Sequence, residues 1–394
     1  MKLLSLAVGL LPLSSLVSAA GPVPVPVVDP EVAAARKIDA YQKKYQDNIL
    51  KTLRGRKPNA KCTEKNLIRR KEWGSVSKEE RIAYVAATHC LARLPNEISN
   101  TEVPGARNRY DDFVSVHLQQ TPWVHFGGNF LNFHRHYVHL YEKALRDECG
   151  YRGAQPYWDW SLSYRDVRNH SIFEGTPWSL GGNGFYEPDR EDVVVEVSHD
   201  SFLAHKPATG GGCIQSGPFT ADKWTVNLGP IGYNVSFEPP AVAGGYGYNP
   251  RCARRDLNPL QSQDSHPTNV TALLEVPDYA SFNIKMDAEK GSVHGAGHFQ
   301  VGGIQLDTYA SPGDPIFWAH HAALDRIWTI WQNWNAAEVQ SRTWSIWGTG
   351  TSGNWPLSAD VTFDSLINFG VLDTPQPIGN LVSTIDGPFC YMYV

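Results

Sequence analysis

The chain has 394 residues, of which 42% are hydrophobic and 19% are charged, and its formal net charge is -5. A chain of this length and composition can bury a large core, which indicates a globular protein. Lysine and arginine are scattered along the sequence and form no basic cluster, so the electrostatic footprint of a nucleic-acid-binding protein is excluded.

The N-terminus has the layout of a secretory signal peptide. One basic residue, Lys2, precedes a mostly apolar run from Leu3 to Val17 and then small residues. This run is too short to cross a membrane, so no membrane association is expected. We predict a signal peptide over residues 1–19, a Pro-Val-rich tether or pro-segment over 20–30, and one folded domain over 31–394.

The cysteines and the glycosylation sequons point to the same extracellular compartment. In an oxidising environment the six cysteines are expected to form up to three disulfides. Spacing alone does not fix their pairing. A Cys62–Cys90 bridge would pin a helix and a Cys213–Cys252 bridge would hold a loop region, which leaves Cys149 and Cys390. Sequons for N-glycosylation begin at Asn169, Asn234 and Asn269. We therefore predict a secreted, extracellular protein.

Helical patterns dominate the domain. Ser77 and Glu80 form a capping box that opens one helix, which carries Cys90. The sequence predicts further helices over 31–53, 107–119, 129–148 and 315–334. Residues 181–258 are rich in glycine and proline, so long ordered loops are expected there. The fold class is therefore predicted to be mainly α, with loop-rich excursions and little β structure.

The 14 histidines are unevenly distributed. One region holds His117, His125, His134, His136 and His139, and a second holds His294, His298, His320 and His321. His294 and His298 lie four residues apart, so on a helix they share one face and can bind one metal. A zinc protease would place a glutamate after the first of them, but Gly295 stands there. The pair by itself is also compatible with a structural role.

Three motifs resemble signatures of the tyrosinase, catechol oxidase and haemocyanin family. The segment DPIFWAHHAALDRIW, which begins at Asp314, is similar to the family's second-copper signature. PYWDW, which begins at Pro156, and Phe133-His134-Arg135 resemble two others. The resemblance extends roughly from residue 62 to residue 394. It implies that residues 31–394 form a tyrosinase-like catalytic domain, in which a four-helix-bundle core holds two copper ions.

The resemblance also assigns metal ligands. It implies that His117, His125 and His134 hold the first copper, and that His294, His298 and His321 hold the second. An all-imidazole donor set suits copper, whereas iron and manganese sites usually add carboxylates. We expect His136, His139 and His320 to point away from the metals. The other histidines have no partner at a useful spacing; these are His89, His170, His199, His205 and His266.

Further residues are expected around the ligands. The family pattern implies a buried ion pair between Arg135 and Asp325 that links two copper-bearing helices. Relatives that hydroxylate monophenols often have asparagine where this chain has Gly295, and a nearby carboxylate holds a water beside it. In this chain Glu289 or Asp287 is the candidate to hold such a water. Leu306 is a candidate gate above the metals. The chain ends in Tyr391-Met392-Tyr393-Val394, which resembles the family's YxY motif.

The expected activity follows from these residues and the resemblance. Because Gly295 has no side chain that could accept a proton, we predict a catechol oxidase that converts o-diphenols to o-quinones and reduces O2 to water. The alternatives are a tyrosinase that also hydroxylates monophenols, an o-aminophenol oxidase, and a non-catalytic O2-binding protein. The expected partners are small phenols and O2, and the expected assembly is a monomer or weak oligomer.

Overall fold

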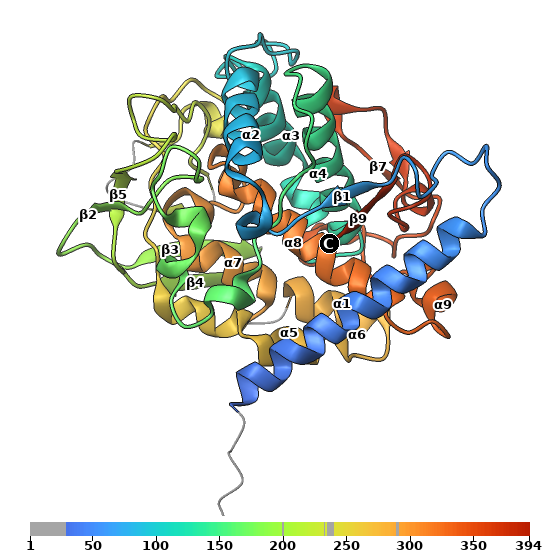
Figure 1. Cartoon of the computed structure of the whole chain (residues 1–394). Coiled ribbons are helices and arrows are strands. Elements are labelled where there is room, and N and C mark those ends of the chain that lie inside the picture. The colour runs from blue at the N-terminus through green and yellow to red at the C-terminus, as the bar shows by residue number, and fades with distance from the viewer. Residues whose placement is uncertain (1–28, 199–200, 232, 235–239, 289–290) are drawn as a thin grey trace, which may run out of the picture.

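The computed structural model describes residues 29–198, 201–231, 233–234, 240–288 and 291–394 (Figure 1). The predicted signal peptide and most of the predicted tether lie outside this part of the chain. Two residues named from the sequence, His199 and Glu289, also lie outside it.

The fold is mainly helical, as predicted (Figure 1). The longer helices agree with the predicted ranges, although α3 continues five residues further, up to the residue before His125. The regular four-helix bundle stays a prediction. The helices are α1 Pro30–Arg54, α2 Lys78–Leu91, α3 Arg109–Val124, α4 Phe130–Asp147, α5 Pro267–Leu274, α6 Tyr279–Asn283, α7 Val293–Val301, α8 Ile316–Asn333 and α9 Val339–Thr343.

Helix α8 is the centre of the core. All of its residues are buried, including polar ones, because α1, α4, α5 and α7 pack around it. The helix ends follow the expected chemistry. Asp29 accepts a hydrogen bond from the N–H of Glu31 at the start of α1, and Ser77 accepts one from the N–H of Glu80 in the predicted capping box. Helix α1 lies along the outside of the molecule, over α5 (Figure 1).

The strands are short, and within the described ranges they form four small sheets. The parallel pair of β1 and β9 joins the start of the domain to the end of the chain. The region predicted as loops contains five of the strands, so it is less irregular than expected. The strands are β1 Ile68–Arg70, β2 Gly184–Tyr186, β3 Val193–Ser198, β4 Ser201–His205, β5 Gly211–Ile214, β6 Tyr233–Asn234, β7 Leu366–Ile367, β8 Gln376–Pro377 and β9 Tyr391–Tyr393.

All six cysteines form disulfides, and one predicted pairing is wrong. Cys213 bonds to Cys252, as predicted. However, Cys62 bonds to Cys390 and Cys90 bonds to Cys149, so the expected Cys62–Cys90 bridge and the leftover Cys149–Cys390 pair do not exist. The reason is long-range. The pairing of β1 with β9 brings the C-terminus beside residue 62, where the Ile68 N–H donates to the carbonyl of Cys390.

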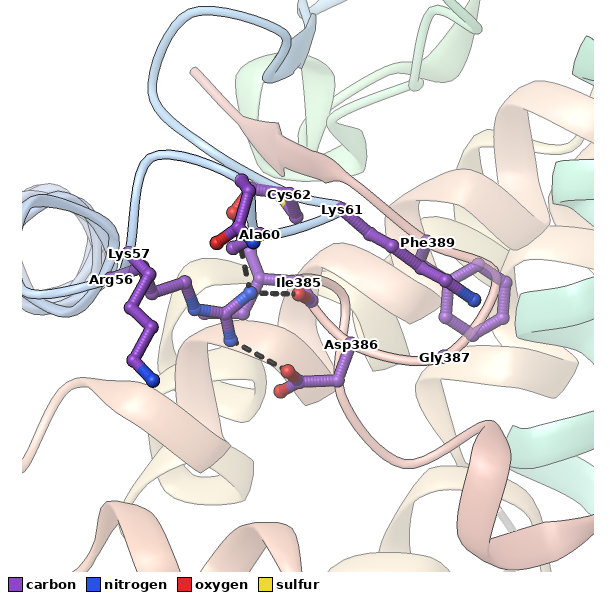
Figure 2. Close-up of a pocket in the computed structure, with 10 residues that line it drawn as sticks. Arg56, Lys57, Ala60, Lys61, Cys62, Ile385, Asp386, Gly387 and Phe389 are labelled. Atoms are coloured by element: carbon purple, nitrogen blue, oxygen red, sulfur yellow. Dashed lines mark hydrogen bonds and ion pairs between the residues drawn. The ribbon is translucent and has the colours of Figure 1, made fainter.

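A surface cavity of about 430 Å³ lies beside this junction, between the loop after α1 and the C-terminal segment (Figure 2). The Arg56 guanidinium donates to the carbonyl of Ile385 and to the carboxylate of Asp386, both over 2.6 Å (Figure 2). No histidine lines the cavity. The cavity is therefore formed where the two ends of the domain meet, and none of the candidate metal ligands lines it.

The described surface bears on two further predictions. Asn169 and Asn269 are exposed, which is compatible with glycosylation, and the surroundings of the Asn234 side chain lie outside the description. Glycosylation stays a prediction. Within the described ranges, every helix is too short or too polar to cross a membrane.

Candidate metal centre

The first histidine group is assembled by α3 and α4. His117 lies on α3, His125 follows the last residue of that helix, and His134 lies on α4. One ring nitrogen from each residue lies within 4.8 Å of the other two, and all three side chains are buried. These are the three residues that the resemblance assigns to the first copper.

Backbone carbonyls orient the rings of this group. The Nδ1 atoms of His117, His125 and His134 lie 2.7, 3.3 and 2.9 Å from the carbonyl oxygens of Tyr309, Thr121 and Phe130, respectively. A carbonyl can only accept, so each Nδ1 carries the hydrogen and each Nε2 has a free lone pair. Within the described residues, the buried Nε2 atoms of His117 and His134 have no protein partner. Such orphaned nitrogens fit a metal ion.

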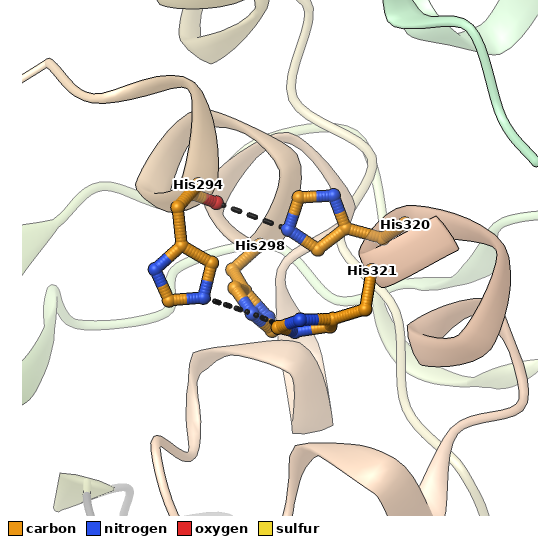
Figure 3. A group of neighbouring side chains, drawn as sticks. All are labelled: His294, His298, His320 and His321. Carbon is orange, nitrogen blue, oxygen red and sulfur yellow. Dashed lines mark hydrogen bonds between the residues drawn. The ribbon is translucent and has the colours of Figure 1, made fainter. Parts of the chain in front are cut away.

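The second group is assembled by α7 and α8 (Figure 3). The Nε2 atom of His298 lies 3.1 Å from Nε2 of His294 and 3.3 Å from Nε2 of His321. Each of these two contacts can hold at most one hydrogen, so hydrogen bonds within the group cannot satisfy the lone pairs of all three nitrogens. A single metal ion could bind all three lone pairs. The donor set therefore fits a metal here too.

His320 belongs to the same cluster but is occupied on both sides. Its Nδ1 accepts a hydrogen bond from the Trp160 indole over 3.2 Å. Its Nε2 donates to the carbonyl of His294 over 3.1 Å (Figure 3). Neither ring nitrogen is left for a metal. This arrangement supports the choice of His321 over its neighbour.

The two groups share one buried space. The rings of His134 and His321 stack with their centroids 4.4 Å apart, and those of His125 and His294 stack at 6.0 Å. Phe317 packs between the groups, 4.0 Å from the His321 ring and 5.2 Å from the His117 ring. Two metals held by these groups would therefore be neighbours.

Burial controls the protonation of the rings. Desolvation lowers the pKa of His117, His134, His298 and His321 well below the usual value of an imidazole. It also lowers the pKa of His125 to about 4, although the nearby Asp287 acts in the opposite direction. The neutral imidazole is the form that binds metals, so these rings are ready to coordinate at neutral pH.

Asp287 has a role that the sequence did not reveal. It lies in a π-helical turn before α7 and is buried. One carboxylate oxygen lies 2.7 Å from Nδ1 of His294, and the other accepts from the backbone N–H of Phe126, next to His125. Asp287 therefore connects the two groups. A carboxylate bonded to a histidine N–H holds the ring and raises its basicity as a ligand.

The predicted ion pair between Arg135 and Asp325 is confirmed. Nε of Arg135 lies 2.6 Å from Oδ1 of Asp325, and the two side chains are 0% and 3% exposed. The hydroxyls of Tyr391 and Tyr393 both donate to Oδ2 of Asp325 over 2.6 Å. These two bonds were not predicted, because they join residues 66 and 68 positions apart and no local spacing indicates them.

Gly295 and Leu306 lie on the side of the second group. A Cβ atom at Gly295 would lie 3.2 Å from the Phe299 ring and 3.3 Å from Oγ of Ser292. Leu306 is buried in a small apolar cluster with Val193 and Val195, against which Phe299 packs. Of the six candidate ligands, His298 alone is partly exposed, so the centre approaches the solvent beside this cluster. A gating role of Leu306 stays a prediction.

The histidines outside the two groups have other partners. His136 bonds to Asp373 over 2.8 Å, and His139 packs edge-on against Phe389. His89 stacks on a phenylalanine, His170 contacts Glu72, and the rings of His205 and His266 bond to backbone carbonyls. None of these residues joins the candidate centre.

Residues 107–334 match the common central domain of tyrosinase. The chain belongs to the tyrosinase family. It is 37% identical over 342 residues to Tyrosinase P of Aspergillus terreus, which covers 85% of this chain and 94% of that relative. It is 35% identical to the N-acetyl-6-hydroxytryptophan oxidase ivoB of Emericella nidulans, with 84% of this chain and 93% of the relative covered.

A solved structure is also similar. A mutant polyphenol oxidase from Thermothelomyces thermophila superimposes with a TM-score of 0.82 at 36% identity, over 91% of this chain and 97% of that one. As a tyrosinase-family member, the protein is a copper oxidoreductase with a dinuclear copper centre. The two histidine groups are the part of the described chain that fits this centre.

Proposed function

We propose that the protein is a secreted catechol oxidase. His117, His125 and His134 hold one copper, and His294, His298 and His321 hold the other. When bound, the copper pair would carry electrons from the phenol to O2, so that two o-diphenols become two o-quinones while one O2 becomes two water molecules. The observation that carries the assignment is the convergence of the Nε2 atoms within two adjacent buried groups.

The residues of the chain contribute orientation and selectivity. The backbone carbonyls and Asp287 hold the rings, and the partly exposed His298 marks the side from which a phenol approaches. At Gly295 no side chain is available to help remove a phenolic proton. Asp287 is already bonded to His294 and Phe126, which leaves it poorly placed for that task. This supports a preference for o-diphenols over monophenols.

Hydroxylation of monophenols is the second candidate, because the Aspergillus terreus relative is called a tyrosinase. The N-acetyl-6-hydroxytryptophan oxidase among the relatives is also named for a monophenol, so it adds to this second candidate. Oxidation of o-aminophenols is the third candidate. Secretion is supported by the signal-like N-terminus and by three disulfides.

Metal analysis and parallel substrate assays test the proposal. We expect two copper ions per purified chain, rapid oxidation of catechol, and little oxidation of tyrosine or of an o-aminophenol. A preparation that holds one copper per chain when fully loaded would contradict the ligand assignment. Prompt oxidation of tyrosine without a catechol primer would contradict the catechol oxidase assignment.

The variant Gly295→Asn tests the role of this position. An asparagine amide beside His294 adds one hydrogen-bonding group, and one such bond is worth roughly 1 kcal/mol, or about a fivefold change in rate. We therefore expect tyrosine oxidation to rise by about that factor while catechol oxidation continues. Gly295→Ala is the matched control, since it adds a Cβ without an amide. An equal rise in both variants would contradict the proposed role.

A further inference from the structure

His320 connects three segments of the chain at the second histidine group. An indole can only donate and a carbonyl can only accept, so Trp160 and the carbonyl of His294 fix one tautomer of His320, with the hydrogen on Nε2. The His320 side chain is 1% exposed, and its ring lies nearly parallel to that of His294 with centroids 5.8 Å apart. Its orientation is therefore determined on both sides.

The contact with α7 depends on a missing side chain. The His320 ring lies directly over Gly297, and a Cβ atom there would overlap three of the ring atoms. Gly297 lies one residue before the candidate ligand His298 and three residues after His294. The His320 ring thus lies against the turn of α7 that carries the two candidate ligands His294 and His298.

The partner of His320 is itself anchored on α8. Trp160 is the last residue of the PYWDW motif, and the N–H of Trp158 in the same motif donates to the carbonyl of Ala319 over 3.0 Å. Asp159 forms an ion pair with Arg326 at 3.1 Å. The motif therefore runs along α8, and Trp160 reaches His320 from a fixed position.

We propose that His320 is a positioning residue for the second copper. It binds no metal, but it sets the distance between α7 and α8, and so keeps His294 and His298 directed toward His321. This inference rests on the ligand assignment proposed above. It assigns a purpose to the first histidine of the HH pair and to the last tryptophan of PYWDW, neither of which touches the metal.

Copper release from holoenzyme variants tests the inference. We would load wild type, His320→Leu, His320→Gln and Trp160→Phe with copper, add an excess of a coloured chelator, and follow release of the two ions. Loss of a group that holds a ligand typically weakens metal binding about 10- to 100-fold. We expect one of the two copper ions to leave His320→Leu faster by about that factor, while the other leaves at the wild-type rate.

The other variants separate positioning from general packing. The glutamine amide of His320→Gln can still donate to the carbonyl of His294, so release should return toward the wild-type rate. Trp160→Phe removes the indole donor but keeps part of the buried aromatic packing, so it should show a smaller acceleration of the same ion. His89→Leu, a half-buried histidine stacked on Phe219, is the matched control and should release both ions normally.

The contrary results are equally specific. Equal acceleration of both ions in His320→Leu, or wild-type release in both His320→Leu and Trp160→Phe, would overturn the inference. A His320→Gln variant that releases copper as fast as His320→Leu would also overturn it. Failure of the proposed function would be seen elsewhere, as fewer than two copper ions in the wild-type protein. Circular dichroism of the metal-free variants shows whether each of them is folded.

Discussion

Each candidate ligand of the first group is oriented by a backbone carbonyl, whereas His294 of the second group is oriented by a carboxylate. The difference has a consequence for mutagenesis, because a carbonyl cannot be removed by substitution and a carboxylate can. Asp287 also holds the backbone beside His125, so one side chain influences both groups. It is therefore the most informative single residue around the centre.

We predict that Asp287→Asn weakens binding of the second copper. The amide of asparagine can accept from only one of the two N–H groups that Asp287 now serves, and its NH2 would face the other donor. The affinity for one copper should fall about 10- to 100-fold, measured by competition with a chelator of known affinity. Asp373→Asn, which changes a carboxylate bonded to His136 outside the centre, is the control. Unchanged affinity in Asp287→Asn would show that the second copper does not depend on the bond between Asp287 and His294.

The sequence could predict some of these residues and not others. The four-residue spacing of His294 and His298 predicts a shared helix face, and the motif resemblance indicates His321 and the ion pair of Arg135 with Asp325. The carbonyl of Tyr309 that holds His117 lies 192 residues away, and no periodicity connects the two. Contacts of this kind depend on how the helices pack, which local patterns do not encode.

At the scale of elements, the long helices were predicted because amphipathic periods and caps are local. The pairing of β1 with β9 was missed, and the disulfide error followed from it, because both join the two ends of the domain. The resemblance already implies that α7 and α8 meet at the second copper, but the contact between Gly297 of α7 and the His320 ring of α8 was missed. A glycine in a helix usually lowers the stability of that helix. At Gly297, however, the absence of a side chain allows the His320 ring to lie against the backbone.

We predict that Gly297→Ala destabilises the protein although alanine is the better helix former. Alanine gains about 1 kcal/mol of helix propensity, but its Cβ would collide with the His320 ring, and overpacking of a core costs about 1–3 kcal/mol. Stability should fall and one copper should be released faster. Gly295→Ala, on the same helix, meets only side-chain atoms at 3.2 Å or more and should be neutral or stabilising. Urea unfolding of the metal-free proteins measures the difference, and equal midpoints for the two variants would contradict the prediction.

Across the whole molecule, Asp325 joins the copper-bearing helices to the end of the chain. It pairs with Arg135 of α4 and accepts from two tyrosines of β9, while Arg70 of β1 lies 3.6 Å away. Arg70 in turn pairs with Glu142 of α4 at 2.6 Å. All of these charges are buried, so each depends on the others for its compensation. The two tyrosines of the YxY motif are neutral donors, and they stabilise the buried Asp325 carboxylate by two further hydrogen bonds.

The double variant Tyr391→Phe/Tyr393→Phe tests these two hydrogen bonds, and its effect should depend on pH. At pH 8 each lost hydrogen bond to the charged Asp325 should cost about 1.5–3 kcal/mol, and the two costs need not add. Burial raises the pKa of Tyr391 and Tyr393 well above the usual value of about 10. The stability that they contribute is therefore complete below pH 10. Above that pH the unfolded tyrosines lose their protons while the folded ones keep them, so the contribution declines by about 1.4 kcal/mol per pH unit for each tyrosine.

Phenylalanine does not titrate, so the gap in unfolding free energy between wild type and variant should be widest near pH 8 and should narrow above pH 10. Guanidinium unfolding of both proteins from pH 8 to 10.5 measures this gap. A gap that stays constant or widens with rising pH would mean that the two hydroxyls are not held as neutral donors to Asp325.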